Sequence, residues 1–497
     1  MNRILSLLLL VISCGILVCP VGELKAERNS DPNRPNIIYI LADDLGYGEL
    51  GSYGQKKIQT PHLDELARQG MKFTQHYSGS AVCACSRCVV LTGKHTGHAY
   101  IRSNREVGGW GPDEPEGQLP LVDEEITIAE LLKDRGYQTA AIGKWGLGGP
   151  GSSGHPCYQG FDKFYGYLCQ RVAHNYYPTH LWNNHDVDVL GNPYFKAHQK
   201  LDSAPEDAEQ WKQYTGSVYA TDRMIDHALQ FIEDNEDKPF FLYYATPIPH
   251  VAIQVPADSL KPYLGQFEEQ PYLGQKSYLP HPTPRAAYAG MISRMDRNIG
   301  RLIAKVQELG LDDNTLIVFS SDNGPTFNGG SDSQFFESAG PLRGLKVSLH
   351  EGGIRVPMIA CWPGKIEAGT TTNLISGFQD ILPTITELGG AQTPSDLDGV
   401  SLVPTLFNTG NQVQHDHLYW ELRNQQSVRA GDWKLYRSAN KNGDIKAELY
   451  NLQTDLGETN NLAKSEPEQL KKMLDIARSA RVPSKEFPSP YDADHSN

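Results

Sequence analysis

Two apolar stretches of the chain each run into a pair of oxygen-bearing side chains. The first ends in Asp43 and Asp44, and the second ends in Asp322 and Asn323. The carboxyl ends of parallel strands meet at one edge of a sheet, which is where open α/β proteins bind ligands. Neighbouring carboxylates repel one another unless a cation lies between them, and oxygen ligands select a hard cation such as Ca²⁺ or Mg²⁺. The two pairs therefore predict a metal site, although a single pair of this kind is more often a turn or a helix cap.

The second reactive feature is a cluster of three cysteines. Cys83, Cys85 and Cys88 lie close together and are followed by the segment Leu91–His95. The chain has eight cysteines, which are too few for a disulfide scaffold of 497 residues. The cluster is compatible with a metal site, a disulfide or a reactive thiol. A second cysteine pair at matching spacing is missing, which disfavours a closed zinc site.

The elements that would position these residues alternate between strands and helices. Continuous apolar runs at 36–42, 240–244 and 315–320 are typical of strands buried on both faces of a parallel sheet. Between them, the spacing of apolar residues predicts helices at 286–309 and around 224–232. This alternation predicts an α/β fold with helices on both sides of the sheet.

The chain changes character after about residue 395. Before that point, residues 257–285 are rich in Pro, Gly, Tyr and Gln and predict a long surface loop that could form a lid. Beyond it, short strand-like pieces precede a charged helix near 466–480; the pieces lie at 417–421, 427–429, 433–436 and 448–450. We therefore predict three parts, namely a leader at 1–26, a large domain at 27–395 and a smaller α+β domain with an antiparallel sheet at 396–497.

The N-terminus and the net charge restrict where the protein works and what it binds. Arg3 precedes an apolar run, which predicts a secretory signal cleaved after Ala26; alternatively, Val11–Cys14 resembles a lipoprotein box with Cys14 carrying the lipid. Both interpretations predict an exported protein that is periplasmic, secreted or lipid-anchored at the outer surface. No other run is apolar enough for a transmembrane span. The net charge of −14 disfavours nucleic acid as a partner.

Taken together, the reactive segments resemble the formylglycine-dependent sulfatases of the alkaline phosphatase superfamily. The first family signature, Cys-x-Pro/Ala-Ser-Arg before Thr-Gly-Lys, is matched by Cys83–Lys94 except at Cys85. The second, Gly-Tyr-x-Thr-x-x-x-Gly-Lys-Trp, is matched by Gly136–Trp145. Further segments are also similar, and all the motifs occur in family order. These segments are Asp43-Asp44, Asp322–Gly324, Lys346, Glu351–Pro357, Ala430–Leu435 and Glu448–Leu452. The resemblance covers nearly all of the chain after the leader. It implies an alkaline phosphatase-like fold with a large, mixed, mostly parallel sheet flanked by helices.

The resemblance implies a sulfatase that uses a modified cysteine. A formylglycine-generating enzyme would oxidise Cys83 to formylglycine, whose hydrate carries two hydroxyls. One hydroxyl would attack the sulfur of a sulfate monoester, so that the alcohol leaves and a covalent sulfate hemiacetal remains. Deprotonation of the second hydroxyl would expel sulfate and restore the aldehyde. A serine would lack this second hydroxyl.

The resemblance also assigns a role to the oxygen ligands. They would hold Ca²⁺, with Mg²⁺ as the alternative, and the cation would contact the oxygen that replaces the Cys83 sulfur. The ligands would be Asp43, Asp44, Asp322 and Asn323.

Four cationic or titratable side chains complete the implied site. Arg87 would stabilise the ionised nucleophile, and Lys144 and Lys346 would hold sulfate oxygens. His250 would contact sulfate or protonate the leaving oxygen. Outside these motifs, such an arginine is typically a structural salt bridge, a lysine is solvated and a lone histidine is structural.

The chain departs from the family pattern at two positions. Cys85 stands where Pro or Ala is usual, and it could impede the modification of Cys83 or form a disulfide with Cys83 or Cys88. Gly146 stands where many relatives have a histidine beside the formylglycine. We expect either that this role is lost or that another histidine fills the space. His174 is the main candidate for that role and for substrate binding, and His155 is the weaker one; either could also be an ordinary loop histidine.

Three functions compete at this point. The leading hypothesis is a sulfatase for a sulfated small molecule or glycan, with aryl sulfates as in vitro substrates. A phosphodiesterase or phosphonate monoester hydrolase with the same nucleophile is the second. An inactive glycan-binding relative with unmodified Cys83 is the third. The substrate alcohol would be chosen by surrounding loops, for which we consider 174–185, 257–285 and the C-terminal residues Trp420, Glu421 and Arg423.

Overall fold

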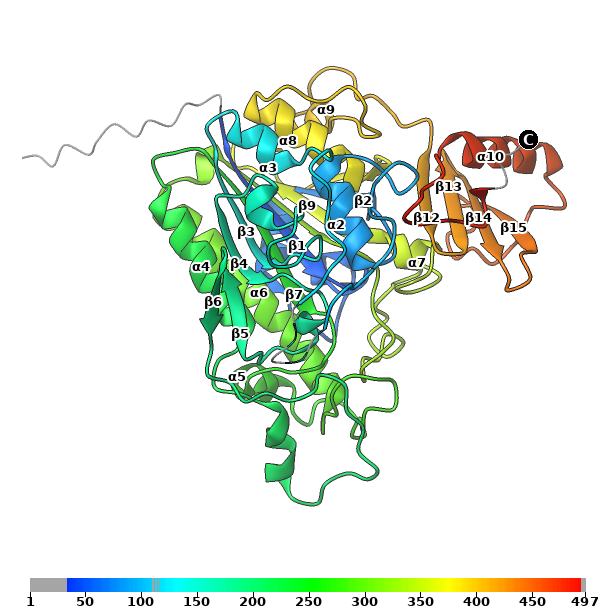
Figure 1. The fold of residues 1–497 in the computed structure, drawn as a ribbon. Helices are drawn as coiled ribbons and strands as arrows, with labels where there is room; N and C mark the ends of the chain where they lie inside the picture. The colour runs from blue at the N-terminus through cyan, green and yellow to red at the C-terminus, as the bar shows by residue number, and fades with distance from the viewer. Residues whose placement is uncertain (1–33, 110, 112–113, 115, 493–497) are drawn as a thin grey trace, which may run out of the picture.

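An 11-stranded mixed sheet forms the centre of the molecule in the computed structural model, which describes residues 34–109, 111, 114 and 116–492 (Figure 1). The predicted leader at 1–26 therefore lies outside the described residues. From one edge to the other, the strands are β10 (Thr370–Thr372), β2 (Met71–Tyr77), β9 (Arg355–Cys361), β8 (Thr315–Ser321), β1 (Asn36–Asp43), β7 (Phe240–Pro249), β3 (Gln138–Lys144), β4 (Lys163–Tyr167), β5 (His180–Asn183) and β6 (Asp186–Val189), and β11 (Ser376–Gly377) pairs with β2.

The middle of the sheet is parallel, as the sequence predicts. β8, β1, β7, β3 and β4 are successive parallel neighbours, whereas β9 and β5 join them antiparallel. All eight residues of β1 are buried, and alternate side chains enter different cores: Tyr39 packs on one face of the sheet and Ile40 on the other. Burial on both faces explains why this strand is a continuous apolar run.

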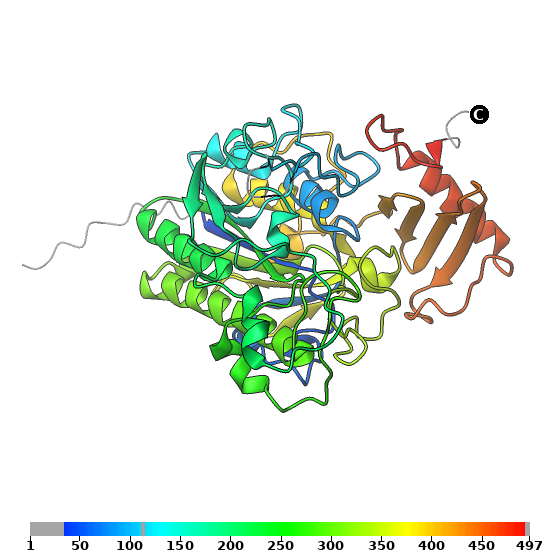
Figure 2. The same ribbon diagram turned by 60° about the horizontal axis from the view of Figure 1, so that its bottom comes forward.

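Helices cover both faces of the sheet (Figures 1 and 2). One face packs against α2 (Cys83–Thr92), α3 (Ile128–Lys133) and α8 (Ile381–Gly389). The other packs against α1 (Pro61–Gln69), α4 (Ala220–Asp234) and α6 (Pro284–Glu308). The helices predicted at 224–232 and 286–309 are thus confirmed as α4 and α6. The remaining short helices are α5 (Ala257–Leu260), α7 (Glu351–Ile354) and α9 (Val403–Leu406). Among the described residues, no helix has the length and apolarity needed to cross a membrane.

The predicted loop at 257–285 is partly wrong. Its first residues form α5 and a 3₁₀ turn, Lys261–Tyr263, which pack against α6. Tyr263 is buried, and its hydroxyl lies 2.6 Å from Ser293 Oγ on α6. Proline supports this local structure because its fixed φ suits the start of a helical turn. Composition alone did not reveal that one buried tyrosine anchors the segment.

A second, smaller sheet lies to one side of the first (Figure 2). It is antiparallel, in the order β12 (Leu418–Leu422), β13 (Gln425–Ala430), β14 (Trp433–Ala439) and β15 (Ile445–Asn451). Helix α10 (Pro467–Ser479) covers it, with Met473 and Ala477 packed against Val428 and Leu435. These strands and this helix confirm the α+β character predicted for the C-terminal part, and the two sheets together confirm the predicted fold class.

Candidate active site

The sequence-predicted site residues converge at the carboxyl ends of the parallel strands. Asp43 is the last residue of β1, and Asp322 follows β8, whose Ser321 is paired with Ala42. Lys144 is the last residue of β3, and His250 directly follows β7. Parallel pairing brings these ends to one edge, as expected for an open α/β sheet.

Cys83 lies at this edge as the first residue of α2. Its side chain is buried, with Sγ 3.4 Å from Asp43 Oδ1 and 3.6 Å from Lys346 Nζ. Burial, reinforced by the charge of Asp43, raises the pKa of the Cys83 thiol well above its ordinary value, despite the nearby lysines. An unmodified thiol here stays protonated and is therefore a poor nucleophile. The backbone N–H of Ala84 donates to Asn104 Oδ1 at 2.9 Å, which holds the start of α2 in place.

Three cationic side chains balance the three aspartates. Arg87 donates from Nη2 to Asp322 Oδ2 at 2.7 Å and lies 3.3 Å from Asp43 Oδ2. Lys144 Nζ lies 2.5 Å from Asp43 Oδ2. Lys346 Nζ lies 2.7 Å from Asp44 Oδ1. The cluster is therefore electrically balanced as a set of side chains, and any further cation would leave it with a surplus positive charge.

The pKa values of the aspartates differ because their neighbours differ. Burial alone would raise the pKa of Asp43, but Lys144, His250 and Arg87 outweigh it and hold that pKa far below the ordinary value. Burial and the charge of Asp43 raise the pKa of Asp322 to about 6. Of these two carboxylates only Asp322 is harder to ionise than usual, and a cation bound beside it would favour its ionised form.

The oxygen donors of the site fit a hard cation, whereas the Cys83 thiol and the His250 imidazole are softer ligands. Asp43, Asp44, Cys83 and His250 each bring a ligand atom within 4.8 Å of the others, and all four are buried. Asn323 donates through Nδ2 to Asp44 Oδ1 at 2.8 Å, but its buried Oδ1 has no hydrogen-bond partner among the described residues. A buried amide oxygen without a partner is costly unless a ligand completes it. Asp44 turns its backbone at φ 66°, which brings the second carboxylate back toward the first.

His250 forms one wall of the site. Its Nδ1 lies 2.5 Å from Val251 O, which makes Nδ1 the donor, and its Nε2 lies 3.8 Å from Asp44 Oδ2. Burial, with Lys346 and Lys144 nearby, lowers the pKa of His250 to about 3. His174 stacks on it, with ring centroids 5.0 Å apart, so the structure brings the predicted His174 to the site through His250.

Two further residues neighbour this wall, of which Tyr278 lies in the segment 257–285 considered for substrate choice and His198 lies in no segment considered above. His198 Nε2 lies 3.0 Å from His174 Nδ1, and the Tyr278 ring packs within 5.8 Å of His250. Both residues come from loops without apolar periodicity, so no sequence pattern distinguishes them.

The space at Gly146 is filled by a residue that the sequence did not suggest. A Cβ at this position would lie 2.7 Å from Gln170 Cγ, and Gly146 has a φ of +88°. Gln170 is buried, and neither Oε1 nor Nε2 has a hydrogen-bond partner among the described residues. The residue next to the Gly146 backbone is therefore a glutamine and not a histidine, whereas His174 approaches the site by stacking on His250.

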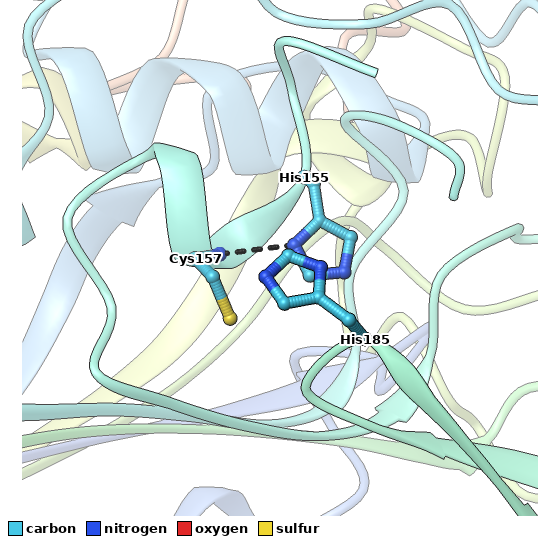
Figure 3. A group of neighbouring side chains, drawn as sticks. All are labelled: His155, Cys157 and His185. Carbon is cyan, nitrogen blue, oxygen red and sulfur yellow. Dashed lines mark hydrogen bonds between the residues drawn. The ribbon is translucent and has the colours of Figure 1, made fainter. Parts of the chain in front are cut away.

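His155, the weaker candidate, belongs to a separate cluster with Cys157 and His185 (Figure 3). Its Nδ1 accepts from the backbone N–H of Cys157 at 3.2 Å, and its Nε2 lies 3.2 Å from Asn184 O. The His185 ring stacks on it at 4.4 Å. Because both imidazole nitrogens of His155 are engaged by the backbone, this histidine has a structural explanation.

The remaining predictions on cysteines and substrate contacts have clear outcomes. All six cysteines that the structure describes are free, and Cys85 Sγ donates to Val82 O at 3.4 Å. Trp420 and Glu421, two of the C-terminal residues considered as substrate contacts, are instead buried and engaged within the protein. Trp420 Nε1 donates to Ser78 O at 2.9 Å, and Glu421 accepts from Arg102 and Arg481 in the contact between the two sheets.

Comparisons with known proteins agree with this geometry. The Sulfatase family profile matches residues 35–391, and the profile described as N-sulphoglucosamine sulphohydrolase, C-terminal, matches residues 345–479. Arylsulfatase A of Homo sapiens is 32% identical over 464 residues, which cover 86% of this chain and 83% of that protein. N-acetylgalactosamine-6-sulfatase of Canis lupus familiaris is 30% identical over 420 residues, which cover 82% and 72%.

A solved structure extends the similarity to three dimensions. Ps i-CgsB in complex with k-i-k-neocarrahexaose has a TM-score of 0.71 and 27% sequence identity, covering 90% of this chain and 93% of its own. The family profile spans most of the chain, and the relatives match over most of their own length. The chain therefore belongs to the sulfatase family, within the alkaline phosphatase superfamily, whose named relatives here are sulfuric ester hydrolases.

Proposed function

We propose that this protein hydrolyses a sulfate monoester of a carbohydrate, with formylglycine made from Cys83 as the nucleophile and Ca²⁺ as the cation. The observation that carries the proposal is the buried cluster of three aspartates, three cationic side chains and the unpartnered Asn323 oxygen around residue 83. The sulfated carbohydrate is supported by the relatives, of which one is named an N-acetylgalactosamine-6-sulfatase and another binds neocarrahexaose.

The oxygen ligands would be Asp43, Asp44, Asp322 and Asn323, and Mg²⁺ is the alternative cation. When bound, the cation would supply positive charge that lowers the pKa of the nucleophile and stabilises the developing charge on sulfate. A formylglycine-generating enzyme would convert Cys83, and the hydrated product would supply one oxygen to attack sulfur and one to expel sulfate.

The cationic side chains would bind the reacting group. Lys346 Nζ is 3.6 Å from Cys83 Sγ, so it can contact both the nucleophile and a sulfate oxygen. Lys144 reaches the same carboxylate edge from β3. With the cation bound, the surplus positive charge of the cluster would be compensated by the anionic ester. Such fixed charges in a buried site need no reorganisation during the reaction.

Arg87 and His250 would act on the two sides of the nucleophile. Arg87 is fully buried and joined to Asp322, so it would hold the start of α2 and stabilise an ionised hydroxyl at residue 83. His250 would present Nε2 to the substrate, because Nδ1 is held by Val251 O. The negative charge of a bound sulfate ester would favour a proton on Nε2, which His250 could then give to the leaving oxygen. His174 would position His250 by stacking.

The test combines mass spectrometry with product analysis. Protein expressed with a formylglycine-generating enzyme is digested with trypsin, and the peptide Phe73–Arg87 is fragmented, because it holds both Cys83 and Cys85. We expect an aldehyde at residue 83, release of sulfate from 4-nitrophenyl sulfate, and no release by Cys83→Ala. A faster rate on phosphate diesters or phosphonates would instead identify the phosphohydrolase alternative. A thiol at residue 83 in protein from its native source would identify the inactive glycan-binding alternative.

A cation assay tests the metal independently of turnover. We expect Ca²⁺ added to chelated protein to raise the melting temperature, because a ligand that binds only the folded state stabilises it. Asn323→Leu should reduce this shift, since it removes the unpartnered oxygen. An equal shift in both proteins would exclude Asn323 as a ligand. A larger shift with Mg²⁺ than with Ca²⁺ would change the assigned cation.

We propose the same division and export that the sequence predicts. The catalytic part would span 27–395 and the α+β part 396–497, after a leader at 1–26 that is either cleaved or carries a lipid on Cys14. The protein would work in the periplasm, outside the cell or at its surface. Mass spectrometry of the mature N-terminus distinguishes cleavage after Ala26 from lipidation at Cys14.

A further inference from the structure

A cavity of about 1000 Å³ lies beside the candidate active site. Its walls come from segments that are distant in the sequence, and the residues used here are Glu116, Trp182, Tyr194, Phe195, Lys196 and His198. The volume is at the upper end of the roughly 300–1,000 Å³ typical of small-molecule pockets. The cavity therefore has room for more than one small polar ring.

The cavity is connected to the site by three stacked or bonded histidines. His198 lines the cavity, and its Nε2 lies 3.0 Å from His174 Nδ1. His174 in turn stacks on His250, whose Nε2 is 3.8 Å from Asp44 Oδ2. The His250–His174–His198 contacts therefore place this cavity directly beyond one wall of the site.

Glu116 is the unusual group in the cavity wall. Its side chain is only 7% exposed. Its Oε1 lies 2.8 Å from His180 Nε2 and accepts from Trp182 Nε1 at 3.2 Å. Its buried Oε2 has no hydrogen-bond partner among the described residues. Two donors thus fix the orientation of the carboxylate while its second oxygen still requires a donor, and a buried polar atom in this condition is costly.

The chemistry of this wall selects a particular kind of ligand. A carboxylate oxygen accepts strong, charge-assisted hydrogen bonds from hydroxyl groups. Trp182, Tyr194 and Phe195 add aromatic surface that can pack against the C–H face of a ring. Hydroxyl donors around an apolar ring face are the pattern of a sugar. Because Glu116 is anionic, the hydroxyl-bearing part that reaches it should not itself carry a negative charge such as a second sulfate.

We propose that this cavity binds a second sugar unit, so that the substrate is a sulfated oligosaccharide and Glu116 recognises hydroxyl groups on the unit next to the sulfated one. The inference rests on the proposed sulfatase function and extends it from a sulfate ester to a chain of at least two sugars. Glu116 acts in specificity only, since it does not touch the reacting sulfate. His180 and Trp182 position its carboxylate.

The test compares substrates of different length in one variant. Glu116→Gln keeps an acceptor for His180 and Trp182 but replaces the unpartnered acceptor oxygen by a donor. The probes are 4-nitrophenyl sulfate, sulfated galactose and N-acetylgalactosamine monosaccharides, and the matching carrageenan and chondroitin sulfate oligosaccharides. The wild-type protein should prefer at least one oligosaccharide over its monosaccharide. Glu116→Gln should lower kcat/KM for that oligosaccharide by about tenfold or more, mainly through KM, as expected for one charge-assisted hydrogen bond.

The short substrates and a matched variant serve as controls. For 4-nitrophenyl sulfate and the monosaccharides, Glu116→Gln should stay within about twofold of wild type, because these molecules do not reach the second unit. Glu124→Gln, the same change at an exposed glutamate that does not line the cavity, should leave every substrate unchanged. Equal losses on all substrates, or no loss on any, would overturn the inference.

Failure of the inference is separable from failure of the proposed function. If formylglycine-bearing protein releases no sulfate from any probe, the proposed function fails. If it hydrolyses 4-nitrophenyl sulfate but never prefers an oligosaccharide, only the second-sugar subsite fails. Calorimetric titration with desulfated oligosaccharides measures the cavity without the sulfate. We expect binding to wild type that is weakened about tenfold in Glu116→Gln, and an unchanged affinity would contradict the assignment.

Discussion

Two buried clusters of charged side chains, one at the strand ends and one between the two sheets, have similar composition. They differ in whether every polar atom has a hydrogen-bond partner. In the first, Asp43, Asp44 and Asp322 face Arg87, Lys144 and Lys346. In the second, Glu351 and Glu458 face Lys434, which is also fully buried. We call the first the strand-end cluster and the second the inter-sheet cluster.

The inter-sheet cluster is complete by itself. Lys434 Nζ lies 2.8 Å from Glu351 Oε1 and 3.1 Å from Glu458 Oε1. Tyr77 donates to Glu351 Oε2 at 2.7 Å, and the backbone N–H of Glu351 donates to Glu458 Oε2 at 2.7 Å. Every carboxylate oxygen therefore has a donor. The cluster joins α7 to β14 and has no carboxylate oxygen left to bind a ligand.

The strand-end cluster retains polar atoms that lack a strong hydrogen-bond partner. Asn323 Oδ1 has no partner among the described residues, and Asp43 Oδ1 has only a thiol at 3.4 Å. Composition alone therefore does not distinguish these two clusters, whereas the unpartnered polar atoms of the strand-end cluster do. The predictions below test this difference.

The largest effect is expected on stability in the inter-sheet cluster. Lys434→Met leaves two buried carboxylates without their shared cation, so the free energy of unfolding should fall by about 3–5 kcal/mol. Residual activity of the folded fraction on 4-nitrophenyl sulfate should stay near that of wild type. Denaturant and thermal unfolding measure the change.

The matched control for Lys434 is an exposed lysine of the same small sheet. Lys446 pairs with Glu448 on β15, and its side chain is 70% exposed. Lys446→Met should change the free energy of unfolding by no more than about 1 kcal/mol, as surface ion pairs contribute little. Similar losses in the free energy of unfolding in both variants would show that the buried, fully paired Lys434 contributes no more stability than an exposed lysine.

The next effect is expected on catalysis in the strand-end cluster. Lys144→Met should lower kcat by about 10²–10³-fold, the usual cost of removing one preorganised charge from the transition state. With Ca²⁺ present, its loss of stability should be smaller than that of Lys434→Met, because the cation compensates Asp43. Steady-state kinetics and melting curves, with and without Ca²⁺, measure both. If Lys144→Met lost as much stability as Lys434→Met and kept its kcat, Lys144 would have a structural role and not a catalytic one.

Acid titration should report on the inter-sheet cluster. Burial alone would raise the pKa of Glu351, but Lys434, Arg355 and Arg429 outweigh it and lower the pKa to about 2, against 4.5 in the unfolded chain. Ionised Glu351 therefore stabilises the fold above pH 4.5, and this contribution is lost as the pH falls through about 2.

The measurement compares melting temperature against pH in wild type and Glu351→Gln. The variant should be less stable near neutral pH, because it lacks the charge that Lys434 needs. The gap should narrow as the pH falls below 4.5 toward 2. A constant gap over this range would show that the lowered pKa is not realised in solution.

The sequence predicted the strand ends well because their signals are local. Asp43 and Asp322 come at the ends of continuous apolar runs, which are typical of central strands in a covered sheet. The rule that parallel strands end at one edge therefore sufficed to bring Asp43 and Asp322 together. Lys144 and Lys346 were assigned through the family resemblance instead, and Lys346 lies in the loop between β8 and α7 rather than at a strand end.

The residues that sequence reasoning missed lie where long loops meet. Glu116, Gln170 and His198 have no periodicity around them, and each becomes meaningful only through a partner brought close by the fold. Trp420 was assigned to the substrate because aromatic residues often bind sugars, but β12 places it against Ser78 between the sheets. Sequence pattern indicates burial more readily than it indicates what a buried residue contacts.

The smallest effect we predict concerns Gly146, where the strand-end region is tightly packed despite its unpartnered polar atoms. Gly146 and Gly443 have nearly equal φ values, +88° and +87°, so an alanine at either position pays the same cost of about 1–2 kcal/mol for a left-handed backbone. Only at Gly146 does the new Cβ meet another side chain, 2.7 Å from Gln170 Cγ, whereas nothing lies within 4 Å at Gly443. Gly146→Ala should therefore lose at least about 1 kcal/mol more stability than Gly443→Ala. The double variant Gly146→Ala/Gln170→Ala should recover that difference in denaturant unfolding. Equal losses in the two single variants would mean that Gln170 moves aside freely, and its unpartnered amide would then not be fixed over the end of β3.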